Sequence, residues 1–245
     1  MNAKDVIDPG WYKTYDEHRD RLFSQIVMLN TRLSILEMLE DFPFLLFLPL
    51  YDDRVFWDEM RNSLAETIIM GIWRIGIDTR NNALTLKRLK NEIRKHLCDQ
   101  SAKEDFKNRC KGANFKTSLS VFEEKIKTIR HQYLAHHNQK PDNLVPINLK
   151  ELREIHDILY DLLRVLFFET HPAKDVWANY SDSVKKTLDA VARDSHYLNW
   201  PEKAENAQFD HEKEWLDEWL EGLSQADFDI YNEYRRKFNL PEVSR

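Results

Sequence analysis

The sequence is poor in glycine and cysteine, and it lacks an apolar run long enough to cross a membrane. Only five of its 245 residues are glycine, while charged residues and large apolar residues are abundant. This composition favours an all-helical protein, and the length allows one or two domains with a hydrophobic core. The most apolar stretch, residues 42–51, contains two prolines. It is expected to be a loop buried against helices or, alternatively, a dimer contact.

Cysteine usage points to a reducing compartment. Cys98 and Cys110 do not form a CxxC pair, which suggests free thiols. The polar N-terminus has no signal-peptide pattern. We therefore expect a cytoplasmic protein with no membrane contact.

Common catalytic and nucleotide-binding motifs are also absent. The chain contains no GxxxxGKS, GxxxxGKT, GxGxxG or GxSxG sequence. Its clustered histidines have no cysteine or carboxylate at metal-ligand spacing beside them. We expect neither a cofactor nor a metal ion.

Apolar residues repeat at intervals of three and four along most of the first 172 residues, which predicts amphipathic helices. The predicted long helices cover residues 14–40, 53–77, 85–96, a segment that ends near 138, and 148–170. Phe56 is expected to face inward on the second of them, and His156 and Asp157 are expected on the surface of the last. These helices predict an antiparallel bundle over residues 1–172.

Residues 173–245 differ from the bundle because they are acidic and rich in tryptophan. Residues 201–233 contain eleven acidic side chains and two lysines, and short helices are expected at 181–193, 209–220 and 224–238. We expect a helical extension whose tryptophans (Trp177, Trp200, Trp215 and Trp219) pack on the bundle or on a neighbouring chain. Alternatively, the acidic extension could shield the basic residues 87–116.

A basic segment interrupts this acidic chain of net charge −6. Residues 87–116 contain ten lysines and arginines against four acidic residues. Such a run is either a solvated face or a contact for an RNA backbone. The RNA-binding candidates lie on the third predicted helix: Lys87, Arg88, Lys90, Arg94 and Lys95.

The densest chemistry lies at residues 130–138, where Arg130 is followed by three histidines. Arginine offers a planar cation that suits a phosphate, and histidine transfers protons near neutral pH. On a straight helix Arg130 and His136 differ by roughly 120° and about 9 Å, so they do not converge. Either the helix unwinds, or a second copy of the chain supplies a second Arg/His pair. The alternative explanation is favourable placement of cations at a helix C-terminus, worth about 0.3–1 kcal/mol.

Arg130, the polar His131 and then His136 at a helix end resemble the signature of the HEPN superfamily, most closely its abortive-infection, AbiU2-like branch. The helix over residues 56–75 and the following residues 78–89 are similar to that branch as well, and the resemblance spans about residues 14–170. It implies a HEPN-like bundle, a homodimer and a metal-independent endoribonuclease of a toxin–antitoxin or antiviral defence system. An antitoxin is then a further expected partner, and RNA is the substrate.

The resemblance also implies roles for the residues of the motif. His136 is the expected general acid and base, Arg130 clamps the phosphate, and cleavage leaves a 2′,3′-cyclic phosphate. His131 would position the phosphate or the histidine, while His137 rivals His136 because it shares a face with Arg130. Supporting roles are assigned to Tyr133, for which a core position is the alternative, and to Asn138. The runner-up function is a non-catalytic module that binds nucleotide, RNA or protein.

Overall fold

The computed structural model describes most of the chain. The described residues are 2–47, 51–78, 80, 83–115, 117–118, 120, 123, 126–127, 148–168, 179–195, 197–205 and 210–244. The protein is all-α, as the composition predicted, and the described residues form no strand beyond one isolated bridge between Ile7 and Leu97. Within these residues, no helix combines the length and apolar character that a membrane span needs.

The chain divides into two compact units, and each is described separately. Unit 1 comprises Met1–Glu37 and Asn62–Ala178, and unit 2 comprises Met38–Arg61 and Asn179–Arg245. The helices α2 and α4 contribute residues to both units. The predicted division at residue 172 into a bundle and an extension remains a prediction.

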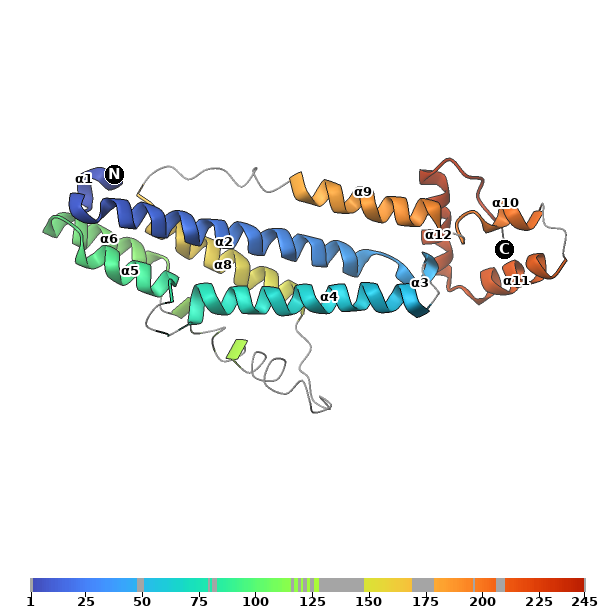
Figure 1. Ribbon diagram of the computed structural model, residues 1–245, viewed down its shortest axis with the longest axis horizontal. Helices are drawn as coiled ribbons and strands as arrows, with labels where there is room; N and C mark the ends of the chain where they lie inside the picture. The colour runs from blue at the N-terminus through green and yellow to red at the C-terminus, as the bar shows by residue number, and fades with distance from the viewer. Residues whose placement is uncertain are drawn as a thin grey trace. The chain divides into compact units, whose positions relative to one another are not determined.

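Unit 1 is built from helices packed around a common hydrophobic core (Figure 1). Its elements are α1 (Ala3–Val6), most of α2 (Pro9–Asp41), the second part of α4 (Tyr51–Ile72), the π-helix η1 (Trp73–Ile77), α5 (Leu86–Lys95), α6 (Gln100–Gly112) and α8 (Leu149–Leu166). The predicted helices at 14–40, 53–77, 85–96 and 148–170 correspond to α2, α4 with η1, α5 and α8.

Contacts along α2 show that α8 runs antiparallel to it. The Tyr15 hydroxyl near the start of α2 donates to the Leu166 carbonyl at the end of α8. Arg153 near the start of α8 instead donates to Glu37 near the end of α2. Helix α4 also approaches α2 closely, because a Cβ built on Gly71 would lie 3.1 Å from Leu29 Cδ1.

The hydrophobic core of unit 1 follows the apolar stripes of these helices. Leu22, Ile26, Leu29 and Leu33 of α2 are at most 1% exposed. Fully burying an aliphatic side chain of this size contributes about 1.5–3 kcal/mol. Ile126, in the segment that precedes the predicted motif, is fully buried in the same core.

Two expectations about individual side chains were wrong. Phe56 was expected inward, but it is 62% exposed on α4. His156 was expected on the surface, but it is fully buried, while the neighbouring Asp157 is exposed. The apolar stripe of α8 was drawn too narrow, since this helix also buries Tyr160 beside the predicted leucines.

Unit 2 contains the short helix α3 and the C-terminal helices. Their bounds are α3 (Phe44–Phe47), α9 (Asn179–Asp194), α10 (Trp200–Glu205), α11 (Asp210–Gly222) and α12 (Gln225–Lys237). The predicted helices at 181–193, 209–220 and 224–238 match α9, α11 and α12. The stretch 42–51 was expected to be a buried loop, but its residues 44–47 form the short helix α3, next to the buried Phe42.

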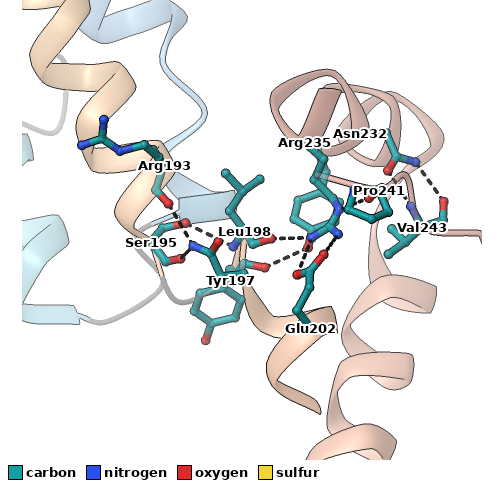
Figure 2. Close-up of polar contacts among 11 residues, drawn as sticks. Arg193, Ser195, Tyr197, Leu198, Glu202, Asn232, Arg235, Pro241 and Val243 are labelled. Carbon is teal, nitrogen blue, oxygen red and sulfur yellow. Dashed lines mark hydrogen bonds and ion pairs between the residues drawn. The ribbon is translucent and has the colours of Figure 1, made fainter. Parts of the chain in front are cut away.

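A buried arginine organises the polar interior of unit 2 (Figure 2). Arg235 of α12 is 1% exposed, and it pairs with Glu202 and donates to the carbonyls of Leu198 and Pro241. Two hydrogen bonds of 3.0 and 3.1 Å join the Asn232 side chain to the backbone of Val243. The C-terminal segment is thereby held against α12.

The tryptophans of unit 2 have different environments. Trp200 and Trp219 cluster with Tyr197, with ring centroids 5.2–6.2 Å apart. Trp215 is 57% exposed on α11. Trp177 lies outside the described residues.

Candidate functional site

The predicted catalytic motif lies outside the part of the chain that the structure describes. This holds for both catalytic candidates, Arg130 and His136, and for the supporting candidates: His131, Tyr133, His137 and Asn138. Their roles stay predictions. The five RNA-binding candidates, by contrast, all lie on the described helix α5.

Helix α5 is fixed at its N-terminal end by a side-chain cap. Thr85 has an extended backbone, and its hydroxyl accepts a hydrogen bond from the Arg88 backbone N–H at 3.1 Å. This is the usual role of threonine at a helix start, where several backbone N–H groups lack a helical partner. The first turn of α5 is therefore well defined.

The other end of α5 is held by the N-terminal segment. The ring of His96, directly after α5, stacks on Trp11 with centroids 4.5 Å apart. The Asp8 N–H donates to the His96 carbonyl at 2.8 Å, and the Cys98 N–H donates to the Val6 carbonyl at 2.9 Å. Together with burial of Leu86, Leu89 and Ile93, these contacts anchor α5 along its whole length.

The apolar residues of α5 face the core, so its lysines and arginines lie on the outer side and make that side strongly cationic. Lys87, Arg88, Arg94 and Lys95 are exposed, and Lys90 is half-buried. Lys87 and Arg94 are seven residues apart, which places them on one face two turns apart. The amphipathic pattern of α5 thus presents a fixed set of cations.

These cations line a cavity of about 930 Å³. Its walls come from η1 and the connection after it, from α5, and from the segment that leads to the predicted motif. The lining residues are Gly76, Ile77, Asp78, Arg80, Ala83, Thr85, Lys87, Arg88, Lys90, Asn91, Glu92, Arg94, Lys95, Phe115, Ser120 and Glu123. The cavity therefore collects six cations and three carboxylates.

Each of the three carboxylates is already paired with a cation. Asp78 binds Arg80, Glu92 accepts from Lys95 Nζ at 2.6 Å, and Glu123 accepts from Lys127 Nζ at 2.7 Å. The hydrogen bond from Lys95 lowers the pKa of Glu92. Ion pairing thus offsets the charge of the three carboxylates, so positive charge predominates in the cavity.

The remaining cations of α5 differ in the contacts that they make within the protein. Lys90 Nζ lies 4.7 Å from the centre of the Phe115 ring, and Arg88 Nη1 donates to the Ala83 carbonyl at 3.2 Å. Lys87 and Arg94 form no ion pair with any residue that the structure describes. These two side chains are available for an anion.

Asp78 and Arg80 belong to this cavity although they were not predicted as site residues. The Asp78 carboxylate is only 3% exposed, and it accepts from the Arg80 backbone N–H at 3.1 Å and from Nε at 2.9 Å. The Arg80 side chain is 71% exposed. The hydrogen bonds from Arg80 raise the pKa of its guanidinium, which stays a permanent cation.

The π-helix explains where Asp78 comes to lie. The Asp78 N–H bonds to the carbonyl of Trp73, five residues earlier, at 2.9 Å. This wider turn adds a residue to the end of α4, and single π-turns of this kind are frequent at functional sites. The spacing of apolar residues predicts a regular α-helix and does not reveal this wider turn.

Chemically, this arrangement suits a phosphate-bearing ligand. Lysine and arginine side chains on one wall offer several charge-assisted hydrogen bonds.

No group of three or more His, Cys, Asp or Glu side chains that could hold a metal ion occurs within the described ranges. Cys98 and Cys110 are both free thiols, and burial raises the pKa of Cys110.

Comparison with known proteins shows a match to a protein family. A family model described as HEPN_AbiU2 matches residues 12–190, which is well over half of the chain. The matched range contains α5, the cavity and the predicted motif. The curated proteins contain no match, and neither do the solved structures.

Proposed function

Because the chain belongs to the AbiU2 family of HEPN proteins, we propose that it is a metal-independent endoribonuclease of a toxin or antiviral defence system. The family match agrees with the resemblance carried by Arg130, His131 and His136. The proposal adds the reaction and the residues that perform it.

The proposed reaction is cleavage of RNA by its own 2′-hydroxyl. A base removes the 2′ proton, the 2′ oxygen attacks the adjacent phosphorus, and an acid protonates the leaving 5′ oxygen. His136 takes the acid and base roles, and the Arg130 guanidinium stabilises the charged phosphorane. His131 and Asn138 position the reacting groups, Tyr133 supports them, and His137 is the alternative acid and base.

One structural observation supports this proposal most directly. The five cations that the sequence selected on α5 all line a single cavity, and Glu123 on its wall precedes Arg130 by seven residues. Seven residues span at most about 25 Å. Phosphates bound along α5 can therefore belong to the same RNA strand that reaches Arg130 and His136.

The site is proposed to form between two copies of the chain. Arg130 and His136 are six residues apart and diverge on a regular helix, so a second Arg/His pair from a partner would complete the phosphate environment. If the active site forms between two copies, an antitoxin that covers or separates the paired motifs would inhibit the enzyme.

The second candidate function is non-catalytic binding of nucleotide, RNA or protein. The cationic cavity favours it because the cavity supplies binding groups but no described acid–base pair. In this case the Arg130–Asn138 motif would hold a ligand or a dimer without cleaving RNA.

Cleavage of single-stranded RNA in EDTA separates the two functions. We expect the purified wild-type protein to cut the RNA. His136→Ala should lose at least about a hundredfold in rate, as removal of a general acid or base does, and Arg130→Ala should lose about as much because the phosphorane charge is no longer stabilised. His137→Ala is the matched control for the imidazole next to His136. Circular dichroism should show that all variants remain folded.

The outcome assigns the function. Full activity in both Arg130→Ala and His136→Ala would remove these residues from catalysis. Binding of intact RNA by the wild type, with no cleavage in EDTA or in Mg²⁺, would favour the binding module. Loss of activity in His137→Ala alone would move the acid–base role to that residue.

A further inference from the structure

We propose that the cavity beside α5 is a phosphate-binding site for the RNA strand, in which Lys87, Arg94 and Arg80 make the contacts. The proposal rests on the proposed function, and it divides the cations of the cavity into those that bind substrate and those that hold the structure. Lys90, Lys95 and Arg88, whose Nη1 donates to the Ala83 carbonyl, belong to the second group.

The position of Lys87 is unfavourable for the helix itself. It lies in the first turn of α5, which contains no acidic residue. Cations at this end are opposed by the helix dipole, whereas anions are stabilised there. Lys87 therefore weakens the helix slightly but adds to the positive potential that attracts a phosphate.

Arg94 extends this attraction along the same face. It is seven residues after Lys87, about 10 Å along the helix axis. Arg94 is exposed, and neither residue forms an ion pair with a described residue. Two separate cations on one face suit two groups of an extended phosphodiester chain better than one isolated anion.

Arg80 is presented to the cavity by a buried carboxylate. Asp78 is 3% exposed and binds both the backbone N–H and the Nε of Arg80. This double contact fixes the guanidinium before a ligand arrives, and prior fixation reduces the entropy lost on binding. Asp78 is therefore a positioning residue that acts through Arg80.

The other two lysines are committed to contacts within the protein. Lys95 pairs with Glu92, three residues earlier on α5. Lys90 is half-buried and lies over the Phe115 ring, where a cation is favoured by the electrons of the ring face. Each lysine has a single ammonium group, and these contacts engage it, whereas Arg80 bonds Asp78 through Nε and Nη2 and its guanidinium carries a further nitrogen, Nη1.

The size of the cavity fits a nucleotide with its flanking phosphates. A volume of about 930 Å³ lies near the top of the range for ligand sites, roughly 300–1,000 Å³. The uncharged lining groups Thr85, Asn91 and Ser120 provide hydrogen-bond partners for a ribose or a base. The cavity is thus larger and more varied than a single inorganic phosphate requires.

Binding of an uncleavable RNA tests this division. The ligand is a single-stranded oligomer with 2′-O-methyl riboses, which removes the attacking hydroxyl, and the protein is the full chain. Lys87→Gln and Arg94→Gln should each weaken binding about fivefold near 0.1 M salt. The slope of log K against log salt is negative, and each variant should make it less negative by about 0.7. The matched control is Lys107→Gln, an exposed lysine of α6 that does not line the cavity, and it should stay within twofold of the wild type.

Two results would overturn the proposal. Equal weakening by Lys107→Gln and Lys87→Gln would mean that RNA responds only to overall charge. Wild-type affinity in the Lys87→Gln, Arg94→Gln double variant would mean that RNA does not use this cavity.

The role of Asp78 is tested by comparison with Arg80. Arg80→Gln leaves the buried Asp78 carboxylate without that guanidinium, although the Arg80 backbone N–H still donates to it, so circular dichroism must first show that the variant is folded. The folded variant should weaken binding about fivefold. Asp78→Asn should have the same effect, and the double variant should be no weaker than Arg80→Gln, since both changes act on one guanidinium. Unchanged affinity in Arg80→Gln would exclude both residues from the site, even if Asp78→Asn failed to fold.

Kinetics and competition separate this inference from the proposed function. If the wild type cuts RNA, the cavity variants should raise KM and leave kcat unchanged, and an unchanged KM would overturn the cavity site alone. If the wild type binds the oligomer through Lys87 and Arg94 but cuts no RNA, only the catalytic proposal fails. Tighter binding of ATP than of the oligomer, with loss in the same variants, would make a free nucleotide the ligand and overturn the RNA assignment.

Discussion

His156 shows how burial sets the chemistry of a single residue. The side chain is fully buried on α8, and burial lowers its pKa, while a hydrogen bond to Asp157 opposes this effect and the charge of Arg153 adds to it. The folded protein therefore favours the neutral imidazole. In the unfolded chain the group has its ordinary pKa of 6.5.

This shift predicts a loss of stability in acid. As the pH falls below 6.5, the unfolded chain binds a proton that the buried imidazole does not, so the free energy of unfolding decreases. The pKa of His18 is also lowered by its burial, and it acts in the same direction. We expect the wild type to have a lower Tm at pH 5.5 than at pH 7.5.

The matched variant is His156→Gln, which keeps a polar side chain but removes the titration. Its Tm should fall less between pH 7.5 and 5.5 than that of the wild type. Thermal unfolding followed by circular dichroism measures the difference. An identical pH dependence in both proteins would show that His156 does not titrate differently on folding.

The sequence missed the burial of His156 for a physical reason. The residue is beside the charged Asp157 and outside the narrow leucine stripe. For a helix with one apolar and one polar face, this predicts an exposed position. Helix α8 instead buries residues over a wider arc, which includes Tyr160. A pattern in one helix does not reveal how many neighbours will surround it.

Among the helices, the contact between α8 and α2 depends on Arg153. Its guanidinium donates to both carboxylate oxygens of Glu37, to the Asn30 amide oxygen and to the Ser34 hydroxyl. The planar fork of arginine makes these bonds together, whereas the ammonium group of lysine cannot. The pair is partly exposed, and solvent therefore weakens it.

We expect Arg153→Lys to lower the free energy of unfolding by about 1 kcal/mol. The matched control is Arg164→Lys on the same helix, where the arginine is more exposed and its ion pair among the described residues is with Asp161 at 3.7 Å. Urea denaturation should show a clear decrease for the first variant and almost none for the second. Equal stability of the two variants would contradict the role assigned to Arg153.

The sequence predicted the long helices well but not the short ones. Helices α2, α4, α5 and α8 have strong apolar stripes or clear caps, such as Asn148, whose side chain accepts from the Lys150 N–H. Helix α6 was missed because it buries little more than Ala102 and Phe106 and is otherwise polar. Helices α1 and α3 have four residues each, which is too short for periodicity to appear.

For the whole molecule, the sequence predicted the charges of the site but not the cavity. Lys87 and Arg94 were selected because they lie in a basic run. Asp78 and Arg80 were not, since their position beside α5 depends on the π-turn at the end of α4, which a periodicity pattern does not reveal. The family match over residues 12–190 adds the context for the motif, whose residues lie outside the described ranges.

In unit 2, the ion pair between the buried Arg235 and Glu202 helps to hold the C-terminal part together (Figure 2). Replacing Arg235 with methionine would leave Glu202 without its cation and two carbonyls without a donor. Glu202 is 39% exposed and can be solvated, so the cost comes mainly from the two carbonyls that lose their donor, and it is on the order of 2 kcal/mol. We expect Arg235→Met to shift unfolding of the Trp200–Trp219 aromatic cluster, measured by tryptophan fluorescence, to lower urea concentration.

The neighbouring residue provides the control. Arg236 is 62% exposed and pairs with Glu242 at 3.4 Å, so Arg236→Met should change the urea midpoint very little. A wild-type midpoint for Arg235→Met would show that the buried arginine does not stabilise unit 2.

The central claim is that Arg130 and His136 cleave RNA through its own 2′-hydroxyl. The most direct measurement is the chemical identity of the 3′ end of the upstream product made in EDTA. The account predicts a 2′,3′-cyclic phosphate for the wild type and no product for His136→Ala. A free 3′-hydroxyl, a requirement for Mg²⁺, or the same cyclic product from His136→Ala would contradict it.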